Sequence, residues 1–446
     1  MAVGTYRILK LCKYLPEHGW TPVVLTVGDN WSYLPELAPR GVSGVKTLRA
    51  QRWRGYLPSS KVDKTHRREP PLLTGEASNR GGEPRVSANR TGLKQFVRQR
   101  LKTWLNFPDQ FSDWIIPAII EGFRAIPEVR PTLIVSSSPP VSCHLVSLVL
   151  SAASGVPMVC DFRDLWTDNE SYDLRHFSRW QSLVDASLEG TVLRKSRAVT
   201  SVTETFLDTL RSKVRGAKQP VWKLVANGVD PEDFLPSLRP KRTNPKFKIV
   251  HLGNLYGHRD PAIFLRIVRE WLQRHPEVRS RVEICFRGDL RDVKAFERFE
   301  DLASVLRIER PTPRSEGLAL LSEADLLLLM LGYQPSSGGV IPAKLFEYVV
   351  VKRPILAFVP EGEAANLIRK YDRGLVISSP DDEKMAIPYL TQAFEQWAAQ
   401  GPQEEESITI PQELTRRFQT AEFARALDAV GGRSSNRPWR QPPRSV

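Results

Sequence analysis

The chain has 446 residues, of which 41% are hydrophobic and 26% charged, and its formal net charge is +14. This composition argues against a wholly disordered, collagen-like or coiled-coil protein, and the length predicts two domains because one core stops growing at roughly 250–300 residues. Four scattered cysteines argue against a disulfide framework or a cysteine-rich zinc site, and they favour a reducing compartment.

Helix and strand signals alternate along most of the chain, which predicts the α/β class with layers of helices around parallel sheets. In the first half we expect a helix over 5–18, strands over 21–26 and 132–137, a helix over 142–154, a strand over 157–162, a helix over 183–193 and strands over 198–202 and 222–225. Residues 55–92 have paired prolines, paired glycines and no period, and they are predicted to form a mobile basic loop.

A polar stretch over 236–246 interrupts the pattern, and the alternation then starts again. We expect strands over 248–252, 282–287, 305–309, 326–331 and 354–359, and helices over 261–275, 315–324 and 343–351. The predicted organisation is an N-terminal domain over 1–235, a linker over 236–246, a C-terminal domain over 247–430 and a disordered basic tail over 431–446.

The positive charge is concentrated in two segments. Residues 51–104 carry a net charge of +9 and residues 431–446 carry +4, so the rest of the chain is nearly neutral. Basic segments without a nucleic-acid-binding module or interleaved aromatics favour an anionic membrane surface over nucleic acid, although an ordinary solvated loop remains an alternative. No apolar stretch is long enough to span a membrane and no signal peptide is visible, so we expect a cytoplasmic protein, peripheral at the inner face of the membrane.

Ligands of open parallel sheets bind beyond the carboxyl ends of the strands, so the polar residues there are the candidates. The strongest local signal is Ser336-Ser-Gly-Gly-Val-Ile-Pro-Ala-Lys-Leu-Phe-Glu-Tyr348. Gly338 and Gly339 would let the backbone approach a ligand, and Lys344 and Glu347 share one face of the following helix. An ordinary Gly-Gly turn with a surface Lys–Glu pair is the alternative.

Two further strand ends carry candidate residues. Gly253-Asn-Leu-Tyr-Gly-His-Arg-Asp260 precedes a helix, and Arg259 could hold two phosphate oxygens, although a plain turn is as good a reading. Asp161-Phe-Arg-Asp164 places three charges at a strand end, either to face a cleft or to pair among themselves. The seven histidines lack metal-ligand spacing and no GxSxG elbow occurs, so we expect neither a tightly bound metal nor a serine hydrolase.

Six segments, taken in order, carry a resemblance to a known family. They are Arg7-Ile-Leu-Lys-Leu-Cys-Lys-Tyr-Leu-Pro-Glu-His-Gly-Trp20, Ser136-Ser-Ser-Pro-Pro140, Asp161-Phe-Arg-Asp-Leu-Trp166, Asn227-Gly-Val-Asp230, His251-Leu-Gly-Asn-Leu-Tyr256 and Pro342-Ala-Lys-Leu-Phe-Glu-Tyr348. In this order they resemble the family-4 glycosyltransferases of bacterial surface-polysaccharide pathways. The resemblance covers nearly the whole chain outside 55–92 and the tail.

The resemblance implies a GT-B fold, in which two Rossmann-like domains face each other across a cleft and the C-terminal one holds a nucleotide-diphosphate sugar. It implies a retaining hexosyltransferase with no tightly bound cofactor or essential metal, acting on a glycan or lipid-linked acceptor. It also implies roles for the candidate residues: Arg259, Lys344, Arg163 and Asp164 are catalytic, Glu347, Gly338, Gly339, Gly253 and Asn254 bind the donor, and Asp161 and Ser137 lie on the acceptor side.

The sequence departs from the family pattern in three places. Asn254 replaces an Arg that often follows the loop glycine, and Gly339 stands where a second Glu is common. The first strand of the N-terminal domain is apparently missing, because only Met1–Gly4 precede the first helix. A nucleotide-sugar 2-epimerase on the same fold and a non-catalytic sugar-nucleotide-binding protein therefore remain alternatives.

Overall fold

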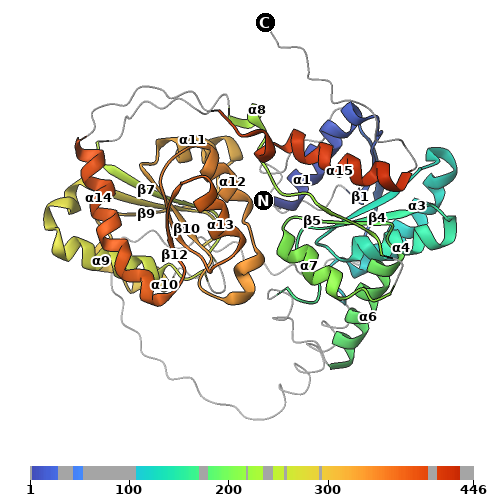
Figure 1. The fold of residues 1–446 in the computed structure, drawn as a ribbon, viewed down its shortest axis with the longest axis horizontal. Coiled ribbons are helices and arrows are strands. Elements are labelled where there is room, and N and C mark those ends of the chain that lie inside the picture. The colour runs from blue at the N-terminus through green and yellow to red at the C-terminus, as the bar shows by residue number, and fades with distance from the viewer. Residues whose placement is uncertain are drawn as a thin grey trace, which may run out of the picture.

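A computed structural model describes residues 3–28, 44–53, 107–169, 179–216, 219–234, 245–255, 259–290, 294–399 and 409–431. Figure 1 shows two α/β halves side by side, the N-terminal half on the right and the C-terminal half on the left. The predicted loop over 55–92, most of the basic segment 51–104, nearly all of the linker 236–246 and the tail after 431 lie outside the described residues.

The N-terminal half is built on parallel strands. Its elements are α1 (Val3–Tyr14), β1 (Val23–Val27), β2 (Lys46–Ala50), α3 (Ile115–Val129), β3 (Ile134–Ser138), α4 (Ser142–Ser154), β4 (Met158–Phe162), α6 (Arg179–Lys195), β5 (Ala198–Ser201), α7 (Glu204–Ser212) and β6 (Val221–Leu224). A four-stranded sheet has the order β3-β4-β5-β6, and β1 pairs with β2 in a separate parallel sheet.

Local sequence explains how several of these elements begin and end. Gly19 and Gly155 adopt left-handed backbone angles, with φ of 77° and 74°, and they end the helical segments that precede them. Few residues other than glycine enter this region without strain. Thr203 caps α7 by accepting a hydrogen bond from the backbone N–H of Phe206.

The C-terminal half contains a single six-stranded sheet. Its elements are β7 (Phe247–Leu252), α9 (Ala262–Arg274), β8 (Val282–Arg287), α10 (Lys294–Glu297), β9 (Leu306–Glu309), α11 (Arg314–Glu323), β10 (Leu326–Met330), a 3₁₀ turn η8 (Pro335–Gly339), α12 (Ala343–Val350), β11 (Ile355–Phe358), α13 (Glu363–Lys370), β12 (Gly374–Ile377) and α14 (Ala386–Ala399). A short helix, α8 (Pro231–Phe234), precedes them in the connection between the halves.

The strands of the second sheet are parallel and follow the order β12-β11-β10-β7-β8-β9. The chain therefore builds the sheet outward in one direction from β7 and then in the other direction from β10. Strand β10 is buried at all five positions, because helices cover both faces of the sheet. The point between β7 and β10 where the order reverses is where such sheets bind ligands.

The last helix, α15 (Arg416–Gly431), packs on the N-terminal half, beside α1 in Figure 1. Phe423 and Leu427 join an apolar cluster with Leu11 and other residues of the first half, and the Trp20 indole N–H donates to Asp428 at 3.0 Å. The predicted domain boundary, which assigned everything up to 430 to the C-terminal domain, is wrong for this helix. Its apolar side chains complete the first core rather than the second.

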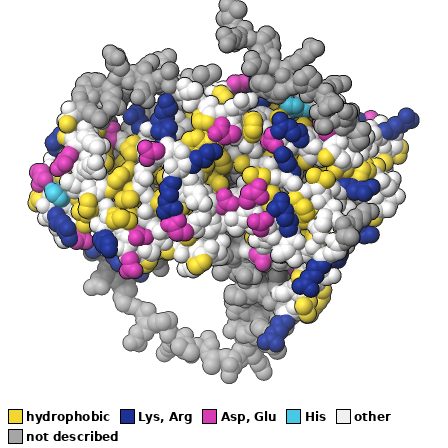
Figure 2. Space-filling model, viewed as in Figure 1, with side chains coloured by type: hydrophobic (Ala, Val, Ile, Leu, Met, Phe, Trp, Pro, Cys, Tyr) yellow, Lys and Arg dark blue, Asp and Glu magenta, His cyan; other side chains and the backbone are white. Residues whose placement is uncertain are grey.

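Charges on the surface are mixed. Figure 2 shows Lys and Arg side chains interspersed with Asp and Glu over the face it presents, so this face carries no large patch of one sign. This agrees with the near-neutral charge of the chain outside its two basic segments. Within the described part of the chain, none of the helices combines the length and the apolar character that crossing a membrane requires.

Candidate functional site

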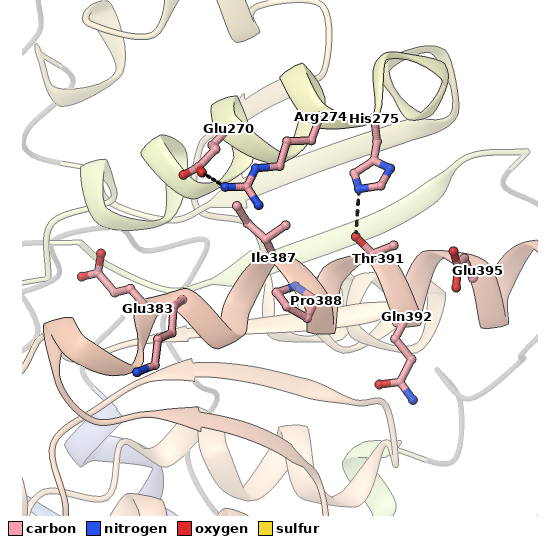
Figure 3. A pocket seen from close by; sticks show the side chains of 10 residues that line it. Glu270, Arg274, His275, Glu383, Ile387, Pro388, Thr391, Gln392 and Glu395 are labelled. Carbon is pink, nitrogen blue, oxygen red and sulfur yellow. Dashed lines mark hydrogen bonds and ion pairs between the residues drawn. The ribbon is translucent and has the colours of Figure 1, made fainter.

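A groove of about 600 Å³ lies between α9 and α14, on the side of the C-terminal half away from the N-terminal half. Figure 3 shows two pairs among its polar groups: Arg274 with Glu270 on one wall, and His275 with Thr391 at 3.5 Å across it. None of the predicted site residues lines this groove. The groove is therefore separate from the candidate site.

The candidate site in the C-terminal half is a group of three basic side chains at the switch point of the sheet. Lys344, in the first turn of α12, reaches the end of β7, where its Nζ lies 3.2 Å from Nε2 of the fully buried His251. Arg259, ahead of α9, is close enough for its charge to lower the pKa values of both groups. Burial is the larger cause and holds the pKa of Lys344 well below its ordinary value.

Two predicted donor-binding residues form the turn beneath Lys344. Gly253 has φ of 130°, and a Cβ atom there would lie 3.1 Å from the Lys344 ammonium nitrogen. Asn254 accepts a hydrogen bond from the backbone N–H of Asp289 through its side-chain oxygen, at 3.0 Å. Glycine thus admits Lys344 to this position, while the Asn254 side chain supports the turn.

Glu347 lies one turn after Lys344 and is almost fully buried. Its Oε1 is 2.5 Å from Nη1 of Arg314, at the start of α11. Burial raises the pKa of the Glu347 carboxyl, and the charge of Arg314 opposes that rise. Glu347 therefore lies close to Lys344 on α12, but its carboxylate forms an ion pair with Arg314.

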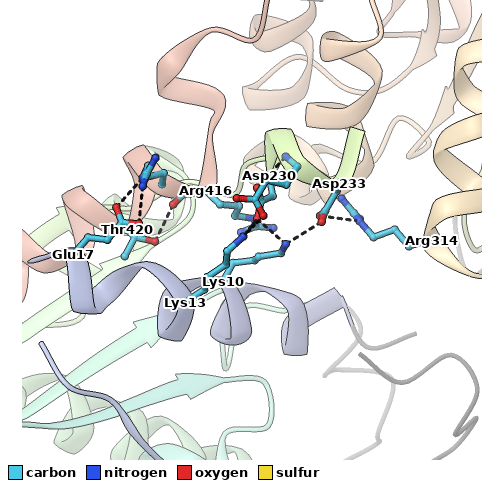
Figure 4. Close-up of polar contacts among 10 residues, drawn as sticks. Lys10, Lys13, Glu17, Asp230, Asp233, Arg314, Arg416 and Thr420 are labelled. Atoms are coloured by element: carbon cyan, nitrogen blue, oxygen red, sulfur yellow. Dashed lines mark hydrogen bonds and ion pairs between the residues drawn. The ribbon is translucent and has the colours of Figure 1, made fainter. Parts of the chain in front are cut away.

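Arg314 also connects the candidate site to the junction between the halves, as Figure 4 shows. Its Nε is 3.4 Å from Asp233 of α8, and its guanidinium stacks over the ring of Tyr6 of α1. From the other side, Lys10 of α1 contacts Asp230 at 2.6 Å and Asp233 at 2.9 Å. The carboxylate expected to bind the donor is thus linked by ion pairs to the first helix of the other half.

The two predicted loop glycines, Gly338 and Gly339, end the turn η8 and pack closely against protein. A Cβ atom on Gly338 would come within 2.9 Å of the Glu361 carbonyl oxygen, and one on Gly339 would meet Phe206 at 2.9 Å. The Gly339 carbonyl accepts a hydrogen bond from Thr203 Oγ1 at 2.9 Å. The backbone of both glycines thus lies close to other parts of the protein, where the sequence predicted a close approach to a ligand. For Gly339, the neighbouring residues belong to the other half.

Asp161, predicted to lie on the acceptor side, is fully buried at the end of β4. Its carboxylate accepts two hydrogen bonds from Arg7, at 3.0 and 2.8 Å, and one each from the hydroxyls of Ser137 and Thr200, both at 2.7 Å. Although burial acts to raise the pKa of Asp161, these partners hold it below its ordinary value. Asp161 was expected on the acceptor side, but its carboxylate is buried and binds Arg7 of α1 to the strand ends. The Ser137 hydroxyl donates to the same carboxylate.

Arg163 and Asp164 lie just beyond this buried pair. The Arg163 guanidinium donates to the carbonyl oxygens of Ser138, at 2.9 Å, and of Pro139. Asp164 remains exposed, yet loss of solvation raises the pKa of its carboxyl, and the positive charges of Arg163 and of Arg259 oppose that rise. The Asp164 carboxyl of the first half is therefore close enough to Arg259 of the second half for their charges to interact.

Sequence reasoning missed His251 and Arg314. A signal for His251 was present, because the residue is the last but one of strand β7 and lies two positions before Gly253. Arg314 follows a proline at a helix start and gives no comparable signal. Over the described ranges, no group of three or more His, Cys, Asp or Glu side chains is arranged to hold a metal ion.

The family described as "Glycosyl transferase 4-like domain" matches residues 4–228, just over half of the chain. The comparison with curated proteins gave no match.

Among solved structures, the chain is similar to sucrose-phosphate synthase from Thermosynechococcus elongatus, with 13% identity, a TM-score of 0.54 and coverage of 96% of this chain and 90% of that one. It is also similar to the Anabaena protein HepE in complex with UDP-glucose, with 15% identity, a TM-score of 0.49 and coverage of 70% and 82%. The fold is the predicted GT-B arrangement of two Rossmann-like halves. From the match over its first half, the chain belongs to the family of proteins with a glycosyl transferase 4-like domain.

Proposed function

We propose that this protein is a glycosyltransferase that transfers a sugar from a nucleotide-diphosphate sugar to an acceptor hydroxyl, with retention at the anomeric carbon. The observation that carries the proposal is the group formed by Lys344 and Arg259 at the switch point of the C-terminal sheet. Basic side chains gathered at the switch point of a parallel sheet favour an anionic ligand there. A diphosphate supplies that anion.

The chemistry of sugar transfer accounts for these residue types. Departure of a nucleoside diphosphate builds negative charge on the leaving oxygens while the sugar becomes oxocarbenium-like. Fixed positive groups aimed at those oxygens stabilise the transition state more than the ground state. In this proposal Arg259 and Lys344 receive the developing charge, Glu347 meets the ribose, and the turn from Gly253 to Asn254 holds Lys344 in place.

The acceptor side of the proposal rests on Arg163 and Asp164, because the Asp164 carboxyl of the first half lies within electrostatic reach of Arg259 of the second. An acceptor bound there would meet the donor sugar between the two sheets. We propose a glycan or lipid-linked acceptor of surface-polysaccharide biosynthesis. Gly339 contributes by packing η8 against α7, and Gly338 by packing it against the Glu361 carbonyl, which together position the start of α12.

Ligand-dependent stability tests the donor site. A panel of UDP-, GDP- and ADP-sugars should contain at least one compound that raises the thermal midpoint, because a ligand bound only to the native state stabilises it. Arg259→Ala should abolish that rise. The matched control is Arg266→Ala on α9, whose side chain is 63% exposed and 3.8 Å from Glu383, and which should leave the rise unchanged. Equal shifts in both variants would remove Arg259 from the site.

Product analysis separates the proposed transfer from its alternatives. With the stabilising donor and an acceptor, a transferase releases the nucleoside diphosphate and forms a glycoside. Conversion of the donor to its 2-epimer without any acceptor would show the epimerase. Intact donor after long incubation with glycan and lipid-linked acceptors would show the binding protein.

We also propose that the basic segments 51–104 and 431–446 hold the protein at an anionic membrane surface, on the strength of their charges of +9 and +4. Electrostatic attachment weakens as salt screens it. Vesicles containing phosphatidylserine should therefore bind the protein at low salt and release it as salt rises, whereas neutral vesicles should not bind it. If the protein does not bind these vesicles, or if its binding does not depend on salt, the proposed membrane attachment is rejected.

A further inference from the structure

The side chain of Arg314 lies between the Glu347 carboxylate and the junction of the two halves. Arg314 follows Pro313 and begins α11. Its Nη1 contacts Oε1 of Glu347 at 2.5 Å, and its guanidinium lies over the Tyr6 ring, 5.4 Å from the ring centre. Its Nε is buried and forms no hydrogen bond with the described residues, so the 3.4 Å approach to Asp233 is the weaker contact. Glu347 is therefore the main partner of Arg314.

The Glu347 carboxylate depends on this partner because it is buried. Its side chain is only 10% exposed. Burial raises the pKa of Glu347, and the charge and the hydrogen bond of Arg314 are the largest influences that oppose the rise. Burial likewise acts to lower the pKa of Arg314, yet that pKa is raised, chiefly by the charge of Glu347. Each group thus keeps the other in its charged form.

The other charged groups around Glu347 come from three elements. Arg416 of α15 favours the carboxylate by its charge, and Asp233 of α8 disfavours it. Lys344 lies one turn earlier on α12 and is itself influenced by the charge of Glu347. Among the described residues, Arg314 is the cation in direct contact with the carboxylate. This contact uses Oε1, which leaves Oε2 for a ligand.

We propose that Arg314 is a positioning residue of the donor site, which holds the Glu347 carboxylate through Oε1 and leaves Oε2 to accept from the ribose hydroxyls of the donor nucleotide. This inference rests on the proposed function, in which Glu347 meets the ribose. An ionised carboxylate can only accept, and a ribose hydroxyl supplies the hydrogen. A buried acceptor of this kind rejects a ligand that lacks the hydroxyl, because the acceptor is left without a partner. Arg314 therefore sets a preference for ribonucleotides over deoxyribonucleotides.

Calorimetry of the full chain measures this preference. The protein is titrated with UDP, GDP or ADP, whichever stabilises it, and with the 2′-deoxy and 3′-deoxy forms of the same nucleotide. Wild type should bind at least one deoxy form about 10–100-fold more weakly, because a hydrogen bond to a charged group is lost. In Arg314→Met this preference should largely disappear, while the deoxy form keeps most of its affinity. A merely structural role of Arg314 would weaken both forms equally.

A double-variant comparison tests whether Arg314 acts through Glu347. Glu347→Gln removes the charge of the carboxylate and should lose the same preference. Arg314→Met should then lower the preference no further in the Glu347→Gln background, because both changes act on one hydrogen-bond acceptor.

Two single variants complete the test. Asp233→Asn removes the charge of the other carboxylate near Arg314 and should leave the preference intact, because the pair with Glu347 remains. Arg314→Lys keeps a positive charge without the planar guanidinium and should give a preference between those of wild type and Arg314→Met. It replaces Arg314→Met if that variant does not fold.

Equal binding of the ribose and deoxy forms by wild type would overturn the inference and leave the proposed function standing, because the nucleoside diphosphate would still bind. A preference that survives unchanged in the Arg314 variant, or that Asp233→Asn removes as completely, would also overturn it. So would losses that add in the double variant, since the two residues would then act independently. If none of the three nucleoside diphosphates binds wild type, the proposed function fails and the inference fails with it.

Discussion

Both halves of the molecule bury charge at the carboxyl ends of their strands, but they do so in opposite ways. In the N-terminal half, Asp161 and Arg7 form a two-point ion pair, and two hydroxyls occupy the remaining acceptor positions of the carboxylate. In the C-terminal half, Lys344 is held by a neutral imidazole and faces the positive Arg259. The first arrangement ties a buried carboxylate to one cation and supports the fold, whereas the second gathers basic groups at the switch point of the sheet, where such sheets bind ligands.

Breaking the ion pair between Asp161 and Arg7 should have the largest effect on the stability of the protein. Asp161→Ala leaves the Arg7 guanidinium, which is 2% exposed, without its carboxylate. Loss of one partner of a buried ion pair costs about 3–5 kcal/mol of stability. Chemical denaturation followed by circular dichroism measures the loss.

A surface ion pair provides the control for that measurement. Asp208 lies 2.8 Å from Arg211 on α7 and is 70% exposed. Asp208→Ala should change stability by less than about 1 kcal/mol, because solvent screens such pairs. Equal losses in Asp161→Ala and Asp208→Ala would contradict the contrast between the two kinds of site.

Removing Lys344 should affect activity instead of stability. Lys344→Met deletes a positive group aimed at the departing diphosphate, and loss of one such group lowers kcat by about 10²–10³-fold. The thermal midpoint should not fall, because the change also removes an amine whose positive charge is disfavoured by burial and by Arg259. Transfer assays and thermal unfolding of the same preparation check both parts. Lys370→Met is the exposed control, and a Lys344→Met protein that loses stability while keeping its activity would count against the assignment.

Gly339→Ala probes the contact that joins the two regions. The added Cβ atom would lie 2.9 Å from Phe206 and 3.0 Å from Thr205 on α7. Such overpacking costs about 1–3 kcal/mol or separates the surfaces that meet there. Donor-induced stabilisation should weaken as well, since η8 precedes the helix that carries Lys344.

The control for Gly339→Ala is a glycine whose neighbour can move. Gly190→Ala in α6 would approach only the end of the Arg194 side chain, at 2.9 Å. It should be neutral, or stabilising by about 0.4–1 kcal/mol, as for glycines in helical conformations. Similar destabilisation in both variants would mean that the contact between the halves has no special role.

The smallest expected effect is the dependence on pH of the stability that Asp161 contributes to the N-terminal half. The pKa of Asp161 is lowered in the folded protein, so its contribution to stability is present above the unfolded pKa of about 3.9 and is lost as pH falls below it. The difference in stability between wild type and Asp161→Asn should therefore narrow by at most about 1.4 kcal/mol per pH unit below pH 4. Denaturation between pH 3 and pH 7 measures it. A constant difference would mean that the carboxyl does not titrate in this range.

Much of the fold could be predicted from periodicity and turn residues. The helix over 142–154 and the strand over 282–287 agree with α4 and β8 residue for residue. Helix α3 was missed although it is strongly apolar, and its internal Pro127 is unusual for a helix. The close approach of Lys344 to Gly253 could not be predicted, because almost a hundred residues separate them and only the strand order brings them together.

The sequence by itself determined the α/β class, the two halves and the positions of the polar residues at the strand ends. These follow from local patterns of apolar and turn residues, which act over a few positions of the chain. Only the tertiary structure decided that Asp161 pairs with Arg7 and Lys344 contacts His251, that Glu347 is held by Arg314, and that α15 returns to the first half. The physical reason is that burial and the nearest opposite charge set the state of an ionisable group, and both depend on residues distant in the chain.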